Sequence, residues 1–276
     1  MSYFNKVSLL VLAFLSPCLA QSTSITDHIN GQSSFIAHAC QPILMIEPPN
    51  AQITHIPRRL FQTWKTHTLP DNFFVWSQTW KTHHPHWNFE LWDDAENRAF
   101  IQFYYPWFLT RYDSYPQEIF RADAVRYFYL YHFGGIYADL DFECCRSIEP
   151  LLNENCVLLG RMSGDWPEHN IPNAFMASPP KAEFWLIVIH CLLNAPESHR
   201  PEHMTGPVIL EQAVSYYQNK KKRQMILDQM RLYFQDAIPI PVQIRPPCEL
   251  YPFEWTSGKY EKLPCAYAVT WWVHSW

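Results

Sequence analysis

The sequence predicts an α/β fold, in which a central sheet is flanked by helices. Segments typical of strands and of helices alternate from residue 53 to residue 160, and this alternation is the pattern of a sheet covered by helices. The chain has 276 residues, of which 48% are hydrophobic and 16% are aromatic, so it can bury one large core. The acids Asp139 and Asp141 follow an apolar segment near the middle of this order.

The first half of the chain is typical of a strand, a helix and a second strand. The expected elements are a strand over 53–64, a helix over 73–83, a strand over 87–92, a short helix over 94–103, an irregular aromatic connection over 106–114 and a helix over 117–133. Gly134 is the natural end of the last helix, because glycine readily adopts the left-handed conformation that terminates helices. Residues 136–138 are strand formers that lead directly into the acids.

Beyond the acids the expected pattern changes from alternating to mostly helical. A strand over 156–160 is followed, after Asn173, by helices over 182–193 and from 207 onward, and then by a proline-rich tail. Residues 21–50 are rich in Ser, Thr, Gln and Pro, which predicts a linker or a loose lead-in. The folded domain is therefore expected over 51–276, without repeats and without a second core.

Asp139 and Asp141 are the first candidate site. Two carboxylates spaced by two residues on a strand point to the same face, while Leu140 points to the core, so the pair can hold one hard cation. The carboxyl end of a buried strand is where α/β sheets bind phosphorylated ligands. An isolated Asp-x-Asp is more often a solvated turn, but a solvated turn needs no apolar lead-in strand. The pair therefore predicts a metal-dependent enzyme that acts on a diphosphate compound.

The first twenty residues have the form of a secretory signal peptide. Lys6 precedes an apolar stretch over 7–15, and small residues precede the expected start of the mature chain at Gln21. A bilayer span needs about 20 apolar residues, and Pro17 interrupts this one early, so an uncleaved N-terminal anchor is the alternative. The expected location is the secretory route, as a secreted, periplasmic or ER/Golgi lumenal protein, with membrane association only through the N-terminus.

The charge of the chain argues against binding to nucleic acid. The net charge is −5 and the pI is about 6.2. The sequence also has no long basic stripe that could neutralise phosphates. The dense basic run over 220–223 falls in a segment with helical character, which indicates a solvated helix face.

Six segments carry a family resemblance. They are 56–64, 87–94, 121–127, 134–141, Thr205-Gly206-Pro207 and His274-Ser275-Trp276. In this order they resemble the glycosyltransferases with a sugar-binding region containing a DXD motif, the group of yeast-type initiating α-1,6-mannosyltransferases and inositol phosphoceramide mannosyltransferases. The resemblance covers roughly residues 53–276.

The resemblance implies a GT-A-like fold for nucleotide-sugar binding, with a mixed central sheet flanked by helices. It also implies a retaining hexosyltransferase, with mannose favoured, that uses a nucleotide-diphosphate sugar as donor. The implied cofactor is a divalent metal, usually Mn²⁺ with Mg²⁺ as the alternative, and the implied acceptor is a glycan, a glycolipid or a protein.

The same resemblance assigns roles to single residues. Trp64 matches the tryptophan that stacks on the nucleobase, and Asp123 and Arg126 match the pair that holds donor-sugar hydroxyls. Asp139 and Asp141 match the two metal-site acids, with Asp139 also touching the ribose. Side-chain chemistry and position, and not the resemblance, suggest four further roles: Asn173 as a hydrogen-bond partner of the donor sugar, His274 and Ser275 as groups that complete the metal and diphosphate shell, and Trp276 as a cover over them.

Several of these residues, and Thr205, also have a plain structural explanation. Asp123 and Arg126 lie three apart, so they suit an ordinary intrahelical salt bridge. Trp64 suits a core tryptophan, residues 274–276 suit a frayed terminus, and Thr205 suits the cap of a helix that begins at Pro207.

Two other functions compete with the transferase. Phosphatases of the aspartate-nucleophile type need a small hydroxyl residue where Glu143 stands, which argues against them. The other rival is a secreted carbohydrate-binding protein without catalysis, and metal-dependent hydrolysis of a nucleotide sugar would separate it from the enzyme.

Overall fold

A seven-stranded mixed sheet forms the centre of the molecule in the computed structural model, which describes residues 42–164, 166–253 and 263–273. The strand order is β1-β8-β6-β7-β4-β2-β3. The strands are β1 (Leu44–Ile46), β2 (Arg59–Thr63), β3 (Asn88–Trp92), β4 (Gly135–Ala138), β6 (Val157–Gly160), β7 (Phe175–Ser178) and β8 (Val242–Arg245). A second sheet pairs β5 (Phe142–Cys144) with β9 (Ala268–Thr270).

The central sheet combines parallel and antiparallel pairs. β2 runs parallel to both β3 and β4, and β6 runs parallel to β8. β7 is antiparallel to its neighbours β4 and β6, and β1 is antiparallel to β8. The predicted α/β architecture with a mixed central sheet flanked by helices is therefore confirmed. The DXD acids follow β4, an interior strand.

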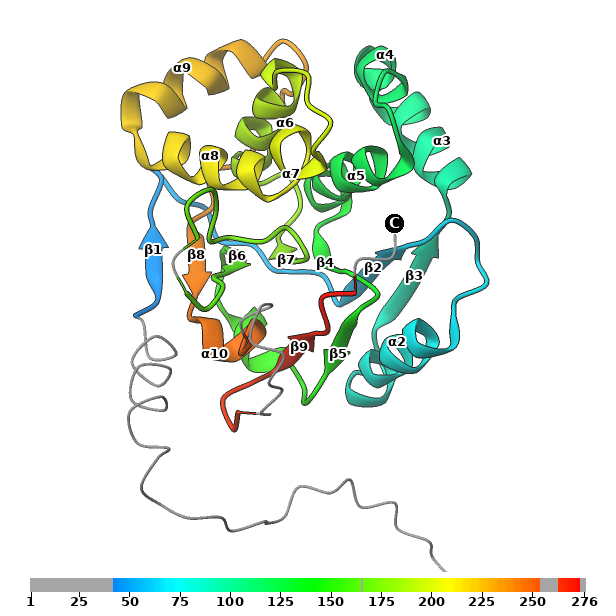
Figure 1. The fold of residues 1–276 in the computed structure, drawn as a ribbon. Coiled ribbons are helices and arrows are strands. Elements are labelled where there is room, and N and C mark those ends of the chain that lie inside the picture. Colours follow the sequence, from blue (N-terminus) through cyan, green and yellow to red (C-terminus); the bar gives the residue numbers. More distant parts are fainter. Residues whose placement is uncertain (1–41, 165, 254–262, 274–276) are drawn as a thin grey trace, which may run out of the picture.

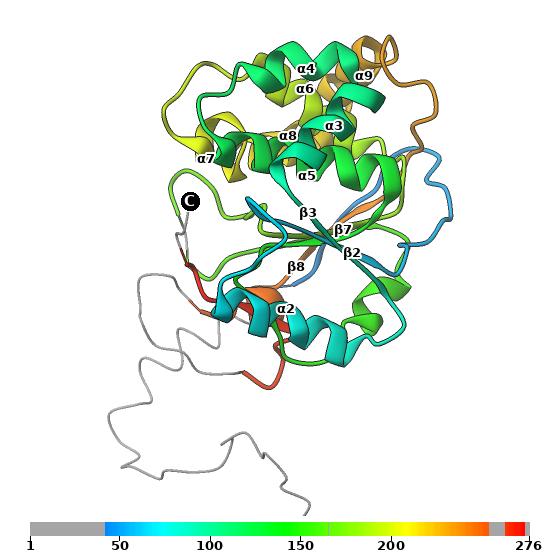
Figure 2. The same cartoon turned by 90° about the vertical axis from the view of Figure 1, so that its right-hand side faces the viewer.

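Helices cover both faces of the sheet (Figures 1 and 2). One face carries α3 (Asp94–Tyr104), α4 (Pro106–Asp113), α5 (Glu118–Phe133), α6 (Phe184–Asn194), α7 (Pro201–Met204), α8 (Pro207–Gln218) and α9 (Lys220–Met230). The other face carries α2 (Asp71–His83), α10 (Pro247–Leu250) and the small β5–β9 sheet, and a 3-10 turn, η1 (Glu149–Asn153), follows β5. No helix within the described residues is both long and apolar enough to cross a membrane.

Two glycines set the point where the chain turns from α5 into β4. Gly134 has a φ of 64° and Gly135 a φ of 99°, which are left-handed values that favour glycine. A Cβ at Gly135 would lie 2.6 Å from the backbone oxygen of Arg59 in β2. Only glycine therefore lets β4 lie this close to β2, with Asp139 directly after the carboxyl end of the strand.

The prediction of an irregular connection over 106–114 is wrong, because this segment forms α4. Pro106 occupies the first turn, where its missing N–H removes no intrahelical bond. Phe108 and Tyr112 lie four residues apart and are both buried. Packing of this aromatic face against α3 and α5 outweighs the weak helix propensity of the aromatic residues.

The prediction of a mostly helical second half needs correction at two strands. Phe175–Ser178 forms β7 between β6 and β4, and Val242–Arg245 forms β8. Short apolar runs of this length suit a buried strand or a buried helix equally well, and pairing with neighbours decides between them. The lead-in also contributes a strand, since Leu44–Ile46 pairs with β8, so the sheet begins before the predicted start at residue 51.

Candidate active site

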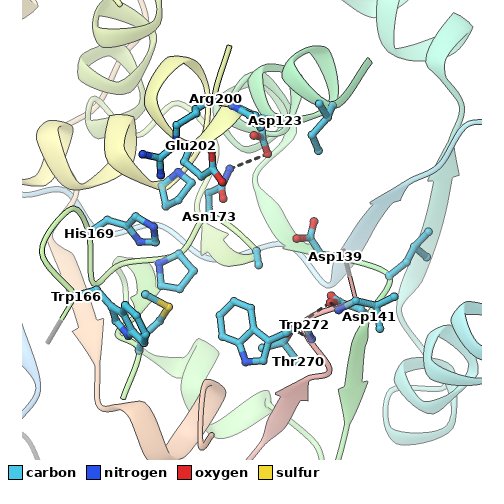
Figure 3. Close-up of a pocket in the computed structure, with 18 of the residues that line it drawn as sticks. Asp123, Asp139, Asp141, Trp166, His169, Asn173, Arg200, Glu202, Thr270 and Trp272 are labelled. Atoms are coloured by element: carbon cyan, nitrogen blue, oxygen red, sulfur yellow. Dashed lines mark hydrogen bonds and ion pairs between the residues drawn. The ribbon is translucent and has the colours of Figure 1, made fainter. Parts of the chain in front are cut away.

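A cavity of about 530 Å³ opens beside the carboxyl ends of β2 and β4. Its wall combines the DXD segment with residues of the 162–174 segment, the turn before α8 and the 270–273 segment. Figure 3 shows Asp139 and Asp141 on one side, Asp123 and Asn173 above them, and Trp166 and His169 on the far side. Parts of the chain that are far apart in sequence therefore meet at the edge where α/β sheets bind ligands.

Arg126 is the centre of a buried network behind the acids. Its guanidinium nitrogens lie 2.9 Å from Oδ1 of Asp123 and 3.1 Å from Oδ1 of Asp139, and the residue is 1% exposed. The pair with Asp123 is intrahelical, as the plain alternative expects, but it also joins α5 to the DXD segment. Asp123 and Asp139 border the cavity, whereas Arg126 is buried against them and acts through their positions.

Further hydrogen bonds fix the orientation of these acids. Asn173 donates from Nδ2 to Oδ1 of Asp123 at 3.0 Å, and the Thr205 hydroxyl donates to Oδ2 at 3.4 Å. The Tyr137 hydroxyl donates to Oδ1 of Asp139 at 2.8 Å, and the Arg126 guanidinium lies over the Tyr137 ring, 4.4 Å from its centroid. Asn173 borders the cavity and Thr205 is buried behind it. Both side chains bind Asp123 here, and Thr205 does not cap α8, whose N-cap is Gly206.

Asp141 is held by a segment that comes more than a hundred residues later. The backbone N–H of Val273 and the hydroxyl of Thr270 donate to Oδ2 of Asp141 at 2.9 and 3.3 Å. The pairing of β5 with β9 brings this segment into place. Trp272, between the two donors, has a φ of 51°, a strained conformation for a bulky residue that is typical of functional sites.

Burial raises the pKa of all three acids. The pKa of Asp141 is about 7, because burial disfavours the charged carboxylate and Asp139 repels it. The pKa of Asp123 is about 6, mainly through burial, with Arg126 opposing the rise. Burial also raises the pKa of Asp139 against the opposing effects of Arg126 and Tyr137. A cation in this cavity would relieve the repulsion between Asp139 and Asp141.

The two DXD residues each keep one carboxylate oxygen for a ligand. Within the described residues, the bonds that other residues make to the carboxylate of Asp139 end on Oδ1, and those to the carboxylate of Asp141 end on Oδ2. Oδ2 of Asp139 and Oδ1 of Asp141 are hard oxygen donors on two residues that border the same cavity, which is the donor chemistry that Mg²⁺ and Mn²⁺ prefer. The residues present therefore fit a divalent ion.

Trp64 borders the cavity and is also packed into the protein. It follows β2, is 9% exposed, and meets Phe73 edge-to-face at 5.0 Å between ring centroids. Leu140 belongs to the same buried cluster. The position thus combines the two readings of this tryptophan, a cavity wall and a core side chain.

Three potential metal ligands meet elsewhere on the surface. One ligand atom from each of His67, Asp93 and Glu96 lies within 4.8 Å of the other two, and two of these residues are exposed. Asp93 and Glu96 form the capping box of α3, so the helix start accounts for their proximity.

The predicted residues His274, Ser275 and Trp276 lie outside the described residues.

Several residues that border the cavity were not predicted as site residues. They are Thr270, Trp272, Trp166, His169, Arg200 and Glu202. Sequence spacing carries no signal for them, since loops and a distant strand bring them to the site. For example, the strained φ of Trp272 depends on the path of the backbone, and no pattern in the sequence indicates it.

The part of the chain that carries the acids is similar to a known protein family. Residues 70–158 match the family described as "Glycosyltransferase sugar-binding region containing DXD motif". This stretch contains Asp123, Arg126, Asp139 and Asp141. Over these residues the chain is similar to a DXD glycosyltransferase sugar-binding region. The resemblance predicted from the six segments is thereby confirmed.

The DXD region is also shared with curated fungal proteins. The chain is 49% identical over 102 residues to inositol phosphoceramide mannosyltransferase 3 of Schizosaccharomyces pombe, a match that covers 37% of this chain and 29% of the relative. It is 35% identical over 181 residues to mannosyl phosphorylinositol ceramide synthase SUR1 of Saccharomyces cerevisiae, covering 64% and 45%. A third relative, CSH1 of the same yeast, is 36% identical over 160 residues, covering 56% and 41%. The matches span less than half the length of these relatives.

A solved structure, the PaToxG glycosyltransferase, aligns with this chain at a TM-score of 0.45 and 17% identity. The alignment covers 75% of this chain and 83% of that one.

Proposed function

We propose that this protein is a metal-dependent, retaining glycosyltransferase that moves a hexose from a nucleotide-diphosphate sugar to an acceptor hydroxyl. The observation that carries the proposal is the pairing of Asp139 and Asp141, each with one carboxylate oxygen left for a ligand in a cavity that Asp123 also borders. A metal site beside a sugar-binding acid is what a nucleotide-sugar donor requires.

The donor would lie along the side of the cavity that holds the acids. The diphosphate is proposed to meet the ion at Asp139 and Asp141, the sugar hydroxyls to meet Asp123 and Asn173, and the base to stack on Trp64. Asp123 and Asn173 already hydrogen-bond to each other, so their geometry is set before a ligand enters. Such preorganisation reduces the entropy that ordering the site would otherwise cost.

The chemistry places charge on the leaving group. When the bond between the anomeric carbon and the diphosphate oxygen breaks, the diphosphate gains negative charge. A divalent ion held by the two acids would stabilise that charge when bound. Arg126 keeps Asp139 oriented and lies too deep to touch the sugar, so we assign it a positioning role in place of the direct contact that the resemblance implies.

Mannose is the proposed sugar, with Mn²⁺ as the favoured ion and Mg²⁺ as the alternative. The support for mannose is its presence in the names of the relatives, an inositol phosphoceramide mannosyltransferase and two mannosyl phosphorylinositol ceramide synthases. The acceptor is proposed to be a glycan, a glycolipid or a protein in the secretory route, since the predicted signal segment would direct the chain there.

A panel of nucleotide sugars tests the proposal. The purified protein is incubated with each sugar and Mn²⁺, and free nucleotide diphosphate and free sugar are measured. We expect one donor to be hydrolysed with Mn²⁺, and we expect no hydrolysis with excess chelator or in the Asp139→Asn and Asp141→Asn variants. Binding of sugars without hydrolysis of any donor would instead support the non-catalytic carbohydrate-binding protein.

A further inference from the structure

The outer surface of the helical layer carries a local concentration of positive charge. Residues 219–234, which contain α9, hold five basic residues and one acidic residue, in a chain whose net charge is −5. Lys220, Lys221 and Lys222 occupy the first turn of α9. Lys181 and Arg231 are paired with acids at 3.1 and 2.7 Å, whereas no carboxylate pairs with the three lysines of α9 among the described residues. The described part of the protein therefore leaves these charges unneutralised.

The fold gains little from Lys220 and Lys221, which are both exposed. The start of a helix is the positive end of its dipole, so cations in the first turn are disfavoured there. The other two members of the basic run differ. Lys222 lies over a tyrosine ring at 4.7 Å, and Arg223 is 5% exposed and donates to the backbone oxygen of Tyr217 at 3.2 Å. A local rule that is broken without a packing gain, as at the two exposed lysines, is typical of a functional surface.

An exposed apolar band continues from α9 toward α4. Leu232 and Tyr233 follow α9 and are 84% and 48% exposed, and Met225 within α9 is 45% exposed. Tyr233 stacks on Trp107 of α4, with 4.2 Å between ring centroids, and Phe103 near the end of α3 is also exposed. Figures 1 and 2 show α9 and α4 on the outer side of the helical layer, away from the sheet. Charged and apolar side chains therefore adjoin each other on one side of the molecule.

Exposed apolar side chains next to unneutralised cations suit the surface of an anionic bilayer. Tyrosine and tryptophan rings favour the membrane–water interface, because one end of each side chain is apolar and the other is polar. Lysines beside such residues attract anionic headgroups. The net charge of the chain is −5, so an anionic bilayer repels the rest of the protein and favours the orientation in which α9 faces it. Charge and side-chain type therefore point to the same partner.

We propose that this side of the helical layer docks on an anionic lipid bilayer. The docking surface consists of Lys220, Lys221, Met225, Leu232, Tyr233 and Trp107. The lysines bind the charged headgroups, and the apolar side chains enter the headgroup region. None of the described residues that border the cavity belongs to the docking surface, so this inference is independent of the proposed catalytic function.

Sedimentation of the full-length protein with lipid vesicles tests the docking surface. The vesicles contain either phosphatidylcholine alone or an equimolar mixture of phosphatidylcholine and phosphatidylserine. We expect the parent protein to favour the mixed vesicles. The double variant Lys220→Gln/Lys221→Gln should bind the mixed vesicles about thirtyfold more weakly, and Leu232→Ser about fivefold more weakly. Lys65→Gln/Lys81→Gln is the matched control, because it removes the same charge from exposed lysines before and within α2, and it should keep the parental affinity.

The N-terminal segment is the same in the parent and in every variant, so binding through that segment alone would not differ among them. Equal binding of the parent to neutral and mixed vesicles would overturn the proposal. So would parental affinity of both the lysine variant and Leu232→Ser for mixed vesicles. Binding of the parent to polyglutamate, without binding to mixed vesicles, would indicate an acidic protein partner in place of a bilayer. Circular dichroism checks that each variant is folded, and the lysine variant decides alone if Leu232→Ser is not.

Discussion

The hydroxyl of Tyr137 donates a hydrogen bond of 2.8 Å to Oδ1 of Asp139, two residues further along the chain. Both side chains therefore lie on the same side of the segment that leaves β4, as expected for residues two apart on an extended chain. Arg126 reaches the same oxygen from α5 at 3.1 Å. Among the described residues, two donors hold the carboxylate on one oxygen, and the other oxygen can bind a ligand.

Replacing Tyr137 by phenylalanine tests this positioning. The variant loses one donor to Asp139 and keeps Arg126, so we expect stability to fall by about 1 kcal/mol. Affinity for nucleotide in the presence of Mn²⁺ should fall about fivefold, because the carboxylate turns more freely. Tyr217→Phe is the control, since its buried hydroxyl bonds to the Ile240 backbone away from the cavity. Equal effects of both variants on nucleotide affinity would contradict the positioning role.

Asp141→Asn should separate metal binding from folding. Asparagine keeps an oxygen that can accept from the Val273 N–H, and it removes a buried charge that burial and Asp139 disfavour. We expect the melting temperature of the metal-free variant to be equal to or above that of the parent at about pH 8, where Asp141 is ionised. Loss of a direct ligand should weaken Mn²⁺ binding by more than about 100-fold. Isothermal titration with MnCl₂ measures this, and parental affinity would argue that Asp141 is no ligand.

Trp64→Ala should affect both stability and donor binding. The side chain is 9% exposed and packs on Phe73, so truncation should cost about 3 kcal/mol. If the ring also stacks on the nucleobase, nucleotide affinity of the folded protein should fall about tenfold. Chemical denaturation measures the free energy of unfolding, and nucleotide titration of the same sample measures the affinity. A large stability loss with unchanged affinity would leave Trp64 as a core residue only.

His84 predicts a pH dependence of stability that is independent of the cavity. Ile148 donates its N–H to Nε2 of His84 at 2.9 Å, so the ring proton lies on Nδ1, which is 3.1 Å from the Trp80 backbone oxygen. Burial lowers the pKa of His84 below its ordinary value of 6.5. Below that pH the unfolded chain binds a proton that the folded protein does not, so stability falls as the pH falls.

Urea denaturation at about pH 7.5 and about pH 5.5 measures this effect. The loss of unfolding free energy between the two conditions should be smaller in His84→Gln than in the parent protein. The exposed His86 provides the control substitution, and His86→Gln should keep the parental difference. An unchanged difference in His84→Gln would show that the ring does not gain its proton on unfolding.

Features that depend on local sequence could be predicted, and features that depend on long-range pairing could not. The strand before Asp139, the end of α5 at Gly134 and the three-residue spacing of Asp123 and Arg126 are local patterns, and each is present in the structure. Nothing in the residues around Asp141 indicates that Thr270 and Val273 will bond to it. That contact depends on the pairing of β5 with β9, and strand pairing is a tertiary property.

The same limit applies to α4 and to the side of the cavity that carries Trp166 and His169. Propensity argued against a helix at Phe108 and Tyr112, and packing decided for it. Trp166 and His169 reach the cavity because Asn170 ties their loop, and no periodic pattern marks such a loop.

The late segment at Thr270 to Val273 also has a consequence for the order in which the molecule assembles. During synthesis the chain emerges from its N-terminal end, so β2, α5 and β4 can pack early. Thr270 and Val273, which donate to Oδ2 of Asp141, leave the ribosome later. Closing a loop of this length is entropically costly and slow. A nascent chain would therefore hold β2, β4 and α5 while its DXD segment is still unfinished, and the proposed metal site would be completed last.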